Sequence, residues 1–323
     1  MTKRLFWIAL ALVPFLFSSQ ANAQTWPTAR PIRIVIGFGP GSASDIFARL
    51  LGDQLSKAIG QSVIVEAKPG AAGRIAAEYV ALAAPDGYTL SFNTNTTHSA
   101  NPYLFKKLNY DPIKDFTPIT RVAFFPFVLL VDANLPIHTV PDLIAYAKAN
   151  PQKTSYAYSS STGQVAAAAL VNTTKMEAVP VVYKSAPEAM TAVVSGLVTF
   201  TVVDFATSQP LVKSGRLRAV AVTSDVRTPL APSLPTIAEA TGLSDFGISA
   251  WTGIFGPANL PPQIVERLNA ELIKILSPKE MQEKVFAMGA NTAPQGPDEF
   301  KVYVKNQLAV WEKQIKIAGM KPE

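Results

Sequence analysis

The chain has 323 residues and a formal net charge of +6, with 29 lysine and arginine residues against 23 aspartate and glutamate residues. It has no cysteine, which excludes disulfides, thiolate metal ligands and cysteine nucleophiles. The basic residues form no long run, so nucleic acid is not an expected partner, while a mildly positive protein suits anionic small molecules.

The first 23 residues have the features of a signal peptide. Lys3 and Arg4 precede the apolar run 5–17, and Ala21-Asn22-Ala23 matches the A-x-A cleavage pattern. The apolar run is too short to span a bilayer comfortably, and no later run is long enough to do so. We expect cleavage after Ala23 and export to the periplasm. The remaining chain of about 300 residues suits two lobes better than one core.

A strand, a glycine-rich turn and a helix follow one another near the start of the mature chain. The β-branched residues 34–36 predict a buried strand, and three glycines follow between positions 37 and 41. Apolar residues then recur at helical spacing, so a helix should begin near Ser42 to Ser44. Free N–H groups at such a helix start favour an anion. Phe38, Gly41 and Ser42 are therefore candidate ligand-binding residues, although a plain connection would use the same residue types.

This glycine turn must be compared with two nucleotide-binding motifs. A P-loop is excluded because no lysine lies between Gly37 and Arg49. The dinucleotide fingerprint G-x-G-x-x-G lacks only its last glycine, and Glu66 ends the next predicted strand, where a ribose-binding acid would sit. A nicotinamide dehydrogenase using the Gly37–Ser42 loop therefore stays open as an alternative.

The next elements predict a parallel sheet with helical crossovers. Strand 63–65, helix 71–84 and strand 88–92 continue a β-α-β-α-β order. The polar run 93–98 leaves the end of the last strand, so it should share one rim with the glycine turn, and its candidate ligand-binding residues are Asn93 and Thr94; an ordinary solvated turn is the alternative. Residues 99–126 predict a mixture of helix and turns, and a strand at 127–131 marks the expected lobe boundary.

The second lobe repeats the strand, polar turn and helix pattern. After helix 140–149, strand 155–158 leads into a run of small polar residues before helix 165–172. Hydroxyls and N–H groups at this helix start suit a carboxylate, although they also suit simple N-capping. The candidate residues of this turn are Ser160, Ser161, Thr162, Gly163 and Gln164.

Two further candidates follow later strands. Strands 179–183 and 197–203 flank helix 187–194 and place Tyr183 and Asp204 at carboxyl ends, where each could bind a ligand or make a structural hydrogen bond. After strand 217–223, strand 248–255 should return to the first lobe. The last expected helices are 262–276, 279–288 and 297–318. We thus assign 24–126 and 248–323 to lobe 1 and 127–247 to lobe 2.

The chain offers little for catalysis. It has only two histidines, His98 and His138, and no G-x-S-x-G motif. His98 lies on the predicted rim, so a hydrolase with a Ser–His pair formed by Ser42 or Ser160 stays open. Two distant histidines and no cysteine make a metal site unexpected, and no cofactor is predicted.

The sequence resembles the Bug-type receptors, the periplasmic substrate-binding proteins of tripartite tricarboxylate transporters. The resemblance extends from Trp26 to Trp311. No single segment is decisive, but together and in this order the matching segments are highly specific for the family. They are 31–35, 40–45, 68–73, 85–90, 110–112, 115–116, 217–223, 234–239 and 251–253. It implies an α/β, two-lobed periplasmic-binding-protein fold of the type II kind, with a ligand cleft between the lobes and no catalysis. It also places Asp45 in the ligand-facing loop.

The same resemblance implies a carboxylate ligand and membrane components of a tripartite transporter as partners; a sensor protein is the alternative partner. The chain departs from the family pattern at Ser42, at Ser161 to Val165 and at Val181 to Ser185, all near the predicted cleft. Phe38 could stack on an aromatic ring, so aromatic and C4–C6 carboxylates are the ligands to test.

Overall fold

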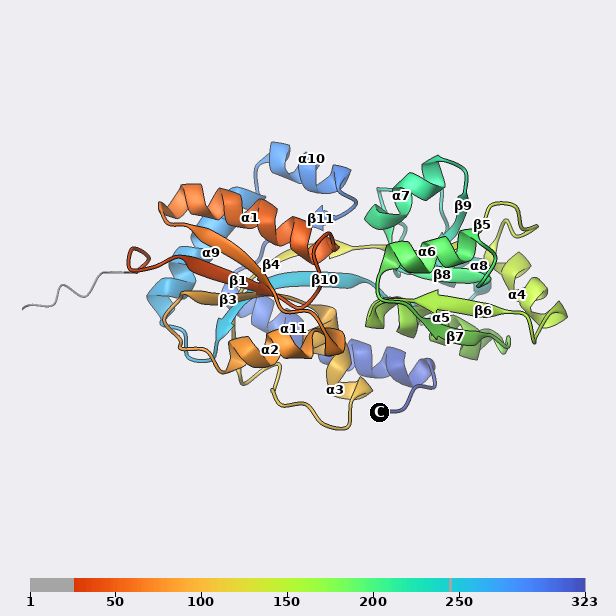
Figure 1. The fold of residues 1–323 in the computed structure, drawn as a ribbon, viewed down its shortest axis with the longest axis horizontal. Helices are drawn as coiled ribbons and strands as arrows, with labels where there is room; N and C mark the ends of the chain where they lie inside the picture. The colour runs from red at the N-terminus through yellow and green to blue at the C-terminus, as the bar shows by residue number, and fades with distance from the viewer. Residues whose placement is uncertain (1–25, 244–245, 323) are drawn as a thin grey trace, which may run out of the picture.

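The computed structural model describes residues 26–243 and 246–322 and shows two α/β lobes side by side along the long axis (Figure 1). Each lobe is built on its own β-sheet, so the expected two-lobed fold is confirmed. The predicted signal peptide, residues 1–23, lies outside the described residues. Among those that are described, no helix has the length and apolar character to cross a membrane.

The sheet of the first lobe has the strand order β11-β4-β10-β3-β1-β2. Its strands are β1 (Ile32–Ile36), β2 (Val63–Ala67), β3 (Thr89–Thr94), β4 (Phe116–Phe125), β10 (Ala250–Pro257) and β11 (Asn291–Thr292). β1 pairs in parallel with both β2 and β3, which confirms the predicted crossovers, while β10 runs antiparallel to β3 and β4. The connections that leave β1 and β3 face the second lobe (Figure 1).

Helices cover both faces of this sheet because each carries an apolar stripe. α1 buries Phe47, Leu51 and Leu55, four residues apart, against one face. The helices of this lobe are α1 (Ala43–Ile59), η1 (Ala71–Gly73), α2 (Arg74–Ala81), the π-helix η2 (Thr96–Ala100), α3 (Asn101–Leu104), α9 (Pro262–Leu276), α10 (Lys279–Ala287) and α11 (Pro297–Ile317). On the other face, residues of α2 and α11 pack with Trp251 and Phe255 in a separate core.

The second sheet has the order β7-β6-β8-β5-β9 and again places parallel strand ends toward the interlobe space. Its strands are β5 (Phe127–Asp132), β6 (Ser155–Tyr158), β7 (Val179–Val182), β8 (Phe200–Asp204) and β9 (Leu217–Val222). Its helices are α4 (Val140–Ala149), α5 (Ser161–Thr174), α6 (Ala186–Val194), α7 (Phe205–Lys213) and α8 (Ile237–Thr241). α6 and α7 share one core on one face, and α4 and α5 lie on the other.

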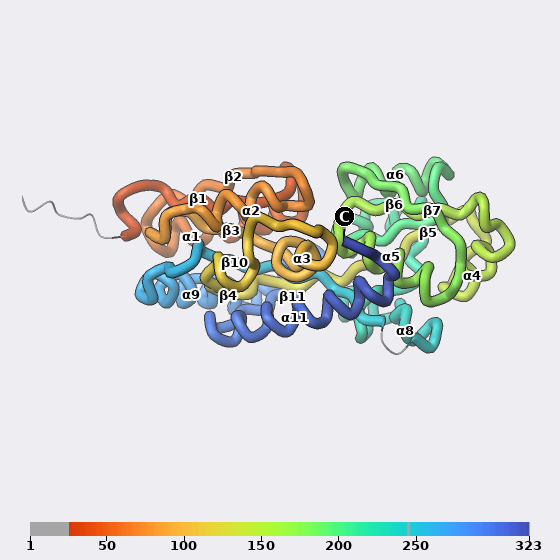
Figure 2. The backbone as a smooth tube through the Cα atoms, turned by 90° about the horizontal axis from the view of Figure 1, so that it is seen from below, coloured from red at the N-terminus to blue at the C-terminus, as the bar shows by residue number. Residues whose placement is uncertain are grey.

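Two short segments cross between the lobes, and they lie side by side. Pro126 separates β4 from β5, and the chain returns just before Ala250, which pairs with Phe125. Ile248 is still attached to the second lobe, because its N–H donates to the Thr223 carbonyl at 2.8 Å. A third link is α11, which runs from the first lobe to α5, where Asn172 Nδ2 donates to the Ile317 carbonyl at 2.7 Å (Figure 2).

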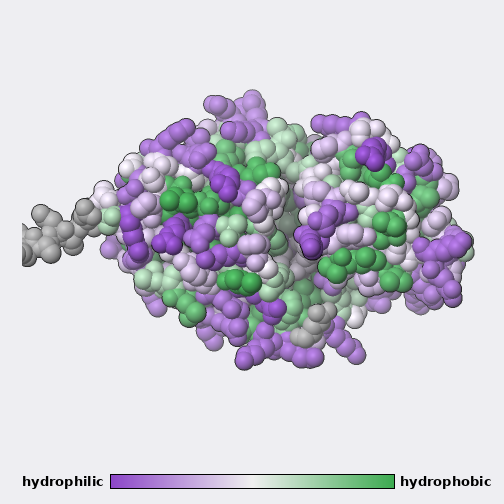
Figure 3. Space-filling model, in the orientation of Figure 1, coloured by the Kyte–Doolittle hydropathy of each residue, from purple (hydrophilic) through white to green (hydrophobic). Residues whose placement is uncertain are grey.

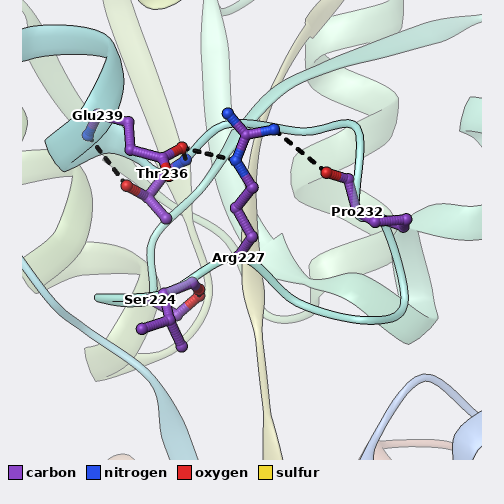
Figure 4. Close-up of polar contacts among 6 residues, drawn as sticks. Ser224, Arg227, Pro232, Thr236 and Glu239 are labelled. Carbon is purple, nitrogen blue, oxygen red and sulfur yellow. Dashed lines mark hydrogen bonds and ion pairs between the residues drawn. The ribbon is translucent and has the colours of Figure 1, made fainter.

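The proline-rich segment between β9 and α8 is held by a small polar cluster (Figure 4). Arg227 Nε lies 2.8 Å from Glu239 Oε2, and its Nη1 donates to the Pro232 carbonyl at 3.2 Å. Thr236 caps α8, accepting from the Glu239 N–H while Glu239 accepts from the Thr236 N–H. This cluster fixes the segment next to the end of β9, where the Val222 N–H donates to the Pro235 carbonyl.

Several predicted elements differ from the structure. Residues 93–98 are not a solvated turn, since Asn93 and Thr94 end β3 and η2 follows at once, all of it buried. The segment 116–125, expected as turns and helix, is the ten-residue strand β4. The helix expected from residue 71 begins at Arg74, and α7 was not predicted.

Candidate functional site

A cavity of about 480 Å³ lies between the lobes, where the space-filling view shows a hollow (Figure 3). Both lobes and both crossings contribute to its wall. The first lobe supplies the turn after β1 and the end of β3, and the second lobe supplies the starts of α5, α6 and α7. The lining residues are Phe38 to Ser44, Thr94 to Thr96, Phe125, Phe127, Ser159, Ser160, Thr162, Lys184 to Pro187, Val203, Asp204, Thr207 and Ala250 to Thr252.

The turn after β1 is held in place by close backbone packing and by Asp45. A Cβ on Gly37 would lie 2.8 Å from the Gly73 Cα, so only glycine allows the two segments to approach. The Gly41 N–H donates to Asp45 Oδ2 at 3.0 Å, and Arg49 Nε lies 2.8 Å from Asp45 Oδ1. Asp45 therefore fixes the loop from behind and does not line the cavity.

The opposite wall is formed by three helix starts in one row. β6 lies between β7 and β8, so the start of α5 lies between those of α6 and α7. Ser160 Oγ caps α5 by accepting from the Gly163 N–H, and Ser185 Oγ caps α6 by accepting from the Glu188 N–H. A Cβ on Gly163 would meet the Val202 carbonyl oxygen at 2.3 Å, which explains a glycine in this helix.

Helix starts of this kind favour an anion. The N–H groups of Ala43, Ser44, Ser161 and Thr162 donate to no acceptor in the described part of the chain. They belong to the first turns of α1 and α5, which approach the interlobe space from opposite lobes. The partial positive charge at a helix N-terminus and its unpaired N–H groups together stabilise a bound carboxylate or phosphate.

Two charged side chains line the cavity, Lys184 and Asp204. Lys184 precedes α6 and makes no ion pair with a described residue. Asp204 caps α7: its Oδ1 accepts from the Thr207 N–H at 2.8 Å and from the Thr207 hydroxyl at 2.7 Å. The remainder of the wall is largely apolar and includes Phe38, Phe125 and Phe127.

Asn95 connects the lobes at the cavity. Its Nδ2 donates to Thr162 Oγ1 at 2.8 Å, and its Oδ1 accepts from the Trp251 N–H at 3.3 Å. Asn95 and Thr162 are 1% and 2% exposed, so this contact between the lobes is almost shielded from water. Such a bond stabilises a closed arrangement of the lobes.

A smaller cavity of about 240 Å³ adjoins the first. The two share Phe38, Thr96, Ser159 and Ser160, and the small cavity is also lined by Ser161, Gln164 and the C-terminal Met320 and Lys321. Phe38 therefore stands between two interlobe spaces. Its side chain is half-buried, packed close to Gly73.

The candidate residues predicted from the sequence fall into three groups. Phe38, Gly41, Ser42, Thr94, Ser160, Thr162 and Asp204 line the main cavity. Ser161 and Gln164 line the smaller one. Asp45, Asn93, Gly163 and Tyr183 line neither cavity.

The four residues outside the cavities have identifiable structural positions. Asn93 is buried in β3, where its Nδ2 donates to Ser91 Oγ at 2.9 Å. The Tyr183 N–H donates to the Tyr158 carbonyl, continuing the β-ladder beyond β7, and its side chain packs with the core under α6. Asn95 was expected on the rim but was not a candidate ligand-binding residue, and Lys184 was not predicted; each is adjacent in sequence to a candidate residue.

The possibility of a Ser–His pair with His98 is wrong. His98 is fully buried among Phe116, Phe255 and Trp251, and its ring nitrogen Nδ1 contacts Thr97 Oγ1 at 3.1 Å. Burial lowers the pKa of His98 to about 3, so the ring is neutral. Neither Ser42 nor Ser160 has a histidine as a hydrogen-bond partner among the described residues. In the same part of the chain, no three His, Cys, Asp or Glu side chains are grouped to hold a metal ion.

Residues 47–320 match the sequence model of the tripartite tricarboxylate transporter family receptor. The chain belongs to this receptor family. The resemblance expected from the sequence is therefore confirmed, and the family consists of binding receptors, so the protein is not an enzyme. This excludes the dehydrogenase and hydrolase alternatives for the Gly37–Ser42 loop.

Individual family members agree with this assignment along almost the whole chain. A UPF0065 protein of Bordetella bronchiseptica is 33% identical over 317 residues, which cover 97% of this chain and 93% of that protein. The structure of Rpa4515 of R. palustris with adipate has a TM-score of 0.87 at 34% identity, covering 92% of this chain and all of the other. MatC of Rhodopseudomonas palustris with bound malate has a TM-score of 0.81 at 29% identity, with 89% and 99% covered.

Proposed function

We propose that this receptor captures a small carboxylate in the interlobe cavity and delivers it to the membrane components of a tripartite tricarboxylate transporter. The observation that carries the proposal is the convergence of Ser-capped helix starts from both lobes on one cavity. Ser42, Ser160 and Ser185 are neutral caps. The first turns of α1 and α6 contain Asp45 and Glu188, whereas that of α5 contains no acidic residue, so the positive end of α5 is left uncompensated. Lys184 adds a full positive charge to the same wall.

The size of the cavity and the ligands of similar proteins support a small acid. A volume of about 480 Å³ lies in the usual range of small-molecule sites. The similar structures contain adipate and malate, which are both dicarboxylates. The apolar part of the wall, which includes Phe38, would contact the carbon skeleton.

Within this proposal, the ligand-contacting residues are those that line the cavity, and Asp45 acts by ordering the loop. The lobes are residues 24–126 with 248–323 and residues 127–247, and they close on the ligand about the two crossings. The positions of Pro126 and Ala250, where the sheets change, support these limits. We further propose that the protein acts in the periplasm after cleavage behind Ala23.

A thermal-shift screen of carboxylates on the mature protein tests the proposal. A ligand that binds only the folded protein at 100 times its dissociation constant adds about 2.7 kcal/mol of stability, which is easily measured. The hits are then titrated by calorimetry beside their methyl esters, which lack the charge. We expect one or more acids to bind and their esters to bind at least about tenfold more weakly. Stabilisation by neutral solutes alone would contradict the proposal.

A further inference from the structure

The cavity wall of the second lobe is electrically asymmetric. β7, β6 and β8 are neighbours, and the pairing of Tyr158 with Val182 and of Ala157 with Thr201 brings Lys184 and Asp204 to opposite sides of Ser160. Neighbouring strands are about 4.8 Å apart, so the backbones on either side of β6 are separated by roughly 10 Å. A cation therefore lies at one end of this wall and an anion at the other.

Asp204 differs from the other caps of the cavity because it carries a charge. The caps of α1, α5 and α6 are serine hydroxyls, whereas α7 is capped by a carboxylate. This charge offsets the positive end of α7, and the Phe205 N–H at that end already donates to the Pro126 carbonyl at 3.0 Å. The α7 side of the cavity is thus unsuited to an anion.

Asp204 still has an unused acceptor. Both hydrogen bonds from Thr207 reach Oδ1, and Oδ2 accepts none from a described residue. The residue lines the cavity and is only partly buried. Its second oxygen is therefore available to a hydroxyl or an ammonium group of a ligand.

We propose that Asp204 selects ligands that carry a hydrogen-bond donor at the end opposite their carboxylate. The carboxylate lies at the Ser160 and Lys184 side, and a hydroxyl or ammonium group contacts Asp204. Preferred ligands are hydroxy- or amino-carboxylates, and acids ionised at both ends bind less well because one carboxylate would face Asp204. This inference rests on the proposed carboxylate function and adds the chemical class and orientation of the ligand.

Calorimetry with matched ligand sets tests this assignment. The probes are butanoate, 4-hydroxybutanoate and 4-aminobutanoate; hexanoate, 6-hydroxyhexanoate and 6-aminohexanoate; and benzoate, 4-hydroxybenzoate and 4-aminobenzoate, with succinate as the acid that is ionised at both ends. Each set of three varies the group at the end opposite the carboxylate, and the hydroxy acid adds a donor without changing the net charge. We expect, in the set that binds, at least a tenfold tighter association of a donor-bearing member over its parent acid, since hydrogen bonds to charged groups are of this size.

The decisive variant is Asp204→Asn, because asparagine keeps a good N-cap for α7 while losing the charge. We expect it to reduce the donor preference to threefold or less and to bind succinate more tightly than the wild type does. Asp53→Asn, at an exposed position on α1, changes the net charge equally. It should leave the donor preference and the affinity for succinate unchanged. Thermal melts confirm that each variant is folded.

The outcomes separate the two proposals. Binding of parent acids as tight as that of donor-bearing acids, or an unchanged preference in Asp204→Asn, overturns the role of Asp204 and leaves the carboxylate function standing. No association with any of these acids at millimolar concentration counts against both proposals.

Discussion

The side-chain amide of Asn95 donates to Thr162 Oγ1 at 2.8 Å, which joins the end of β3 in one lobe to the first turn of α5 in the other. Because Thr162 also offers its N–H at the cavity, the contact couples lobe closure to the proposed anion site. The same amide accepts from the Trp251 N–H on β10, beside the second crossing. The Asn95 side chain thus contacts the opposite lobe, the strand that follows the second crossing and the proposed ligand site.

Removal of this interlobe bond should loosen the closed form and weaken binding. Thr162→Val removes the acceptor with little change of shape, and we expect about five- to tenfold weaker binding of the carboxylate, equivalent to about 1 kcal/mol. Asn95→Ala should weaken carboxylate binding at least as much. In a double-mutant cycle, the two effects should be non-additive by about 1 kcal/mol. Calorimetry gives the affinities, and small-angle scattering with and without ligand reports closure; fully additive effects would rule out the coupling.

Replacement of Asp45 should disturb the binding loop more than the fold. In Asp45→Asn the side chain loses its charge and can no longer accept from both the Gly41 N–H and Arg49 with two carboxylate oxygens. We expect binding to weaken more than tenfold at a cost of about 1 kcal/mol or less in the free energy of unfolding. Calorimetry measures the affinity, and a denaturant titration measures the free energy of unfolding. Asp53→Asn is the control, and tighter carboxylate binding by Asp45→Asn would show that the charge is merely an obstacle.

Phe38 lines both interlobe cavities, so its truncation has two consequences. Phe38→Ala removes apolar contact with the ligand and should weaken binding by roughly 1–3 kcal/mol. Removal of the ring also connects the main cavity to the smaller one, so longer acids, which can extend into both, should lose less affinity than short ones. Calorimetry over a series of acids of increasing chain length tests this, with Phe286→Ala on the exposed side of α10 as control. Unchanged affinity together with a lower melting temperature would assign Phe38 to loop packing alone.

The buried His98 predicts a loss of stability in acid. Its pKa is about 3 in the folded protein and about 6.5 in the unfolded chain, so the unfolded chain binds the proton first as the pH falls. The stability that depends on neutral His98 is complete above about pH 6.5 and declines through the window down to pH 3. At pH 4.5 the loss from this residue approaches about 2–3 kcal/mol.

His98→Phe should flatten this pH dependence. Phenylalanine fits among Phe116, Phe255 and Trp251, and it removes the buried Nε2, which has no partner in the described part of the chain. Urea titrations at pH 7 and pH 4.5 on the wild type and the variant give the difference directly. His138→Phe, in the exposed turn before α4, should keep the wild-type slope. An equal loss of stability in His98→Phe would show that other groups cause the acid effect.

Local patterns predicted the parts of the site that depend on local structure. Ser42 and Ser160 were found because a strand, small polar residues and a helix follow one another in the sequence, and capping is a local interaction. Asn95 was expected on the rim but not as a candidate ligand-binding residue, because β3 extends to Thr94 and residues 96–100 form a π-helix, which changes the side chains that face the cavity. Lys184 was missed in favour of Tyr183 for a similar reason, since side chains alternate near the end of β7.

β4 shows why part of the fold could not be predicted locally. Pro118 lies within it and indicates a break in the sequence, yet at this position β4 pairs only with β10, because β11 reaches only Ala123 and Phe124. A proline at an edge position removes no ladder hydrogen bond. The strand exists because β10, more than a hundred residues later, returns to cover it.

The most direct test of the carboxylate site is a crystal structure of the mature protein with the tightest-binding acid from the screen. We predict that the ligand lies between the lobes with its carboxylate oxygens within hydrogen-bond distance, directly or through one water, of the N–H groups of Ala43 or Ser44 and of Ser161 or Thr162. A ligand whose carboxylate lies outside the interlobe space, or contacts neither helix start, would contradict the proposed function.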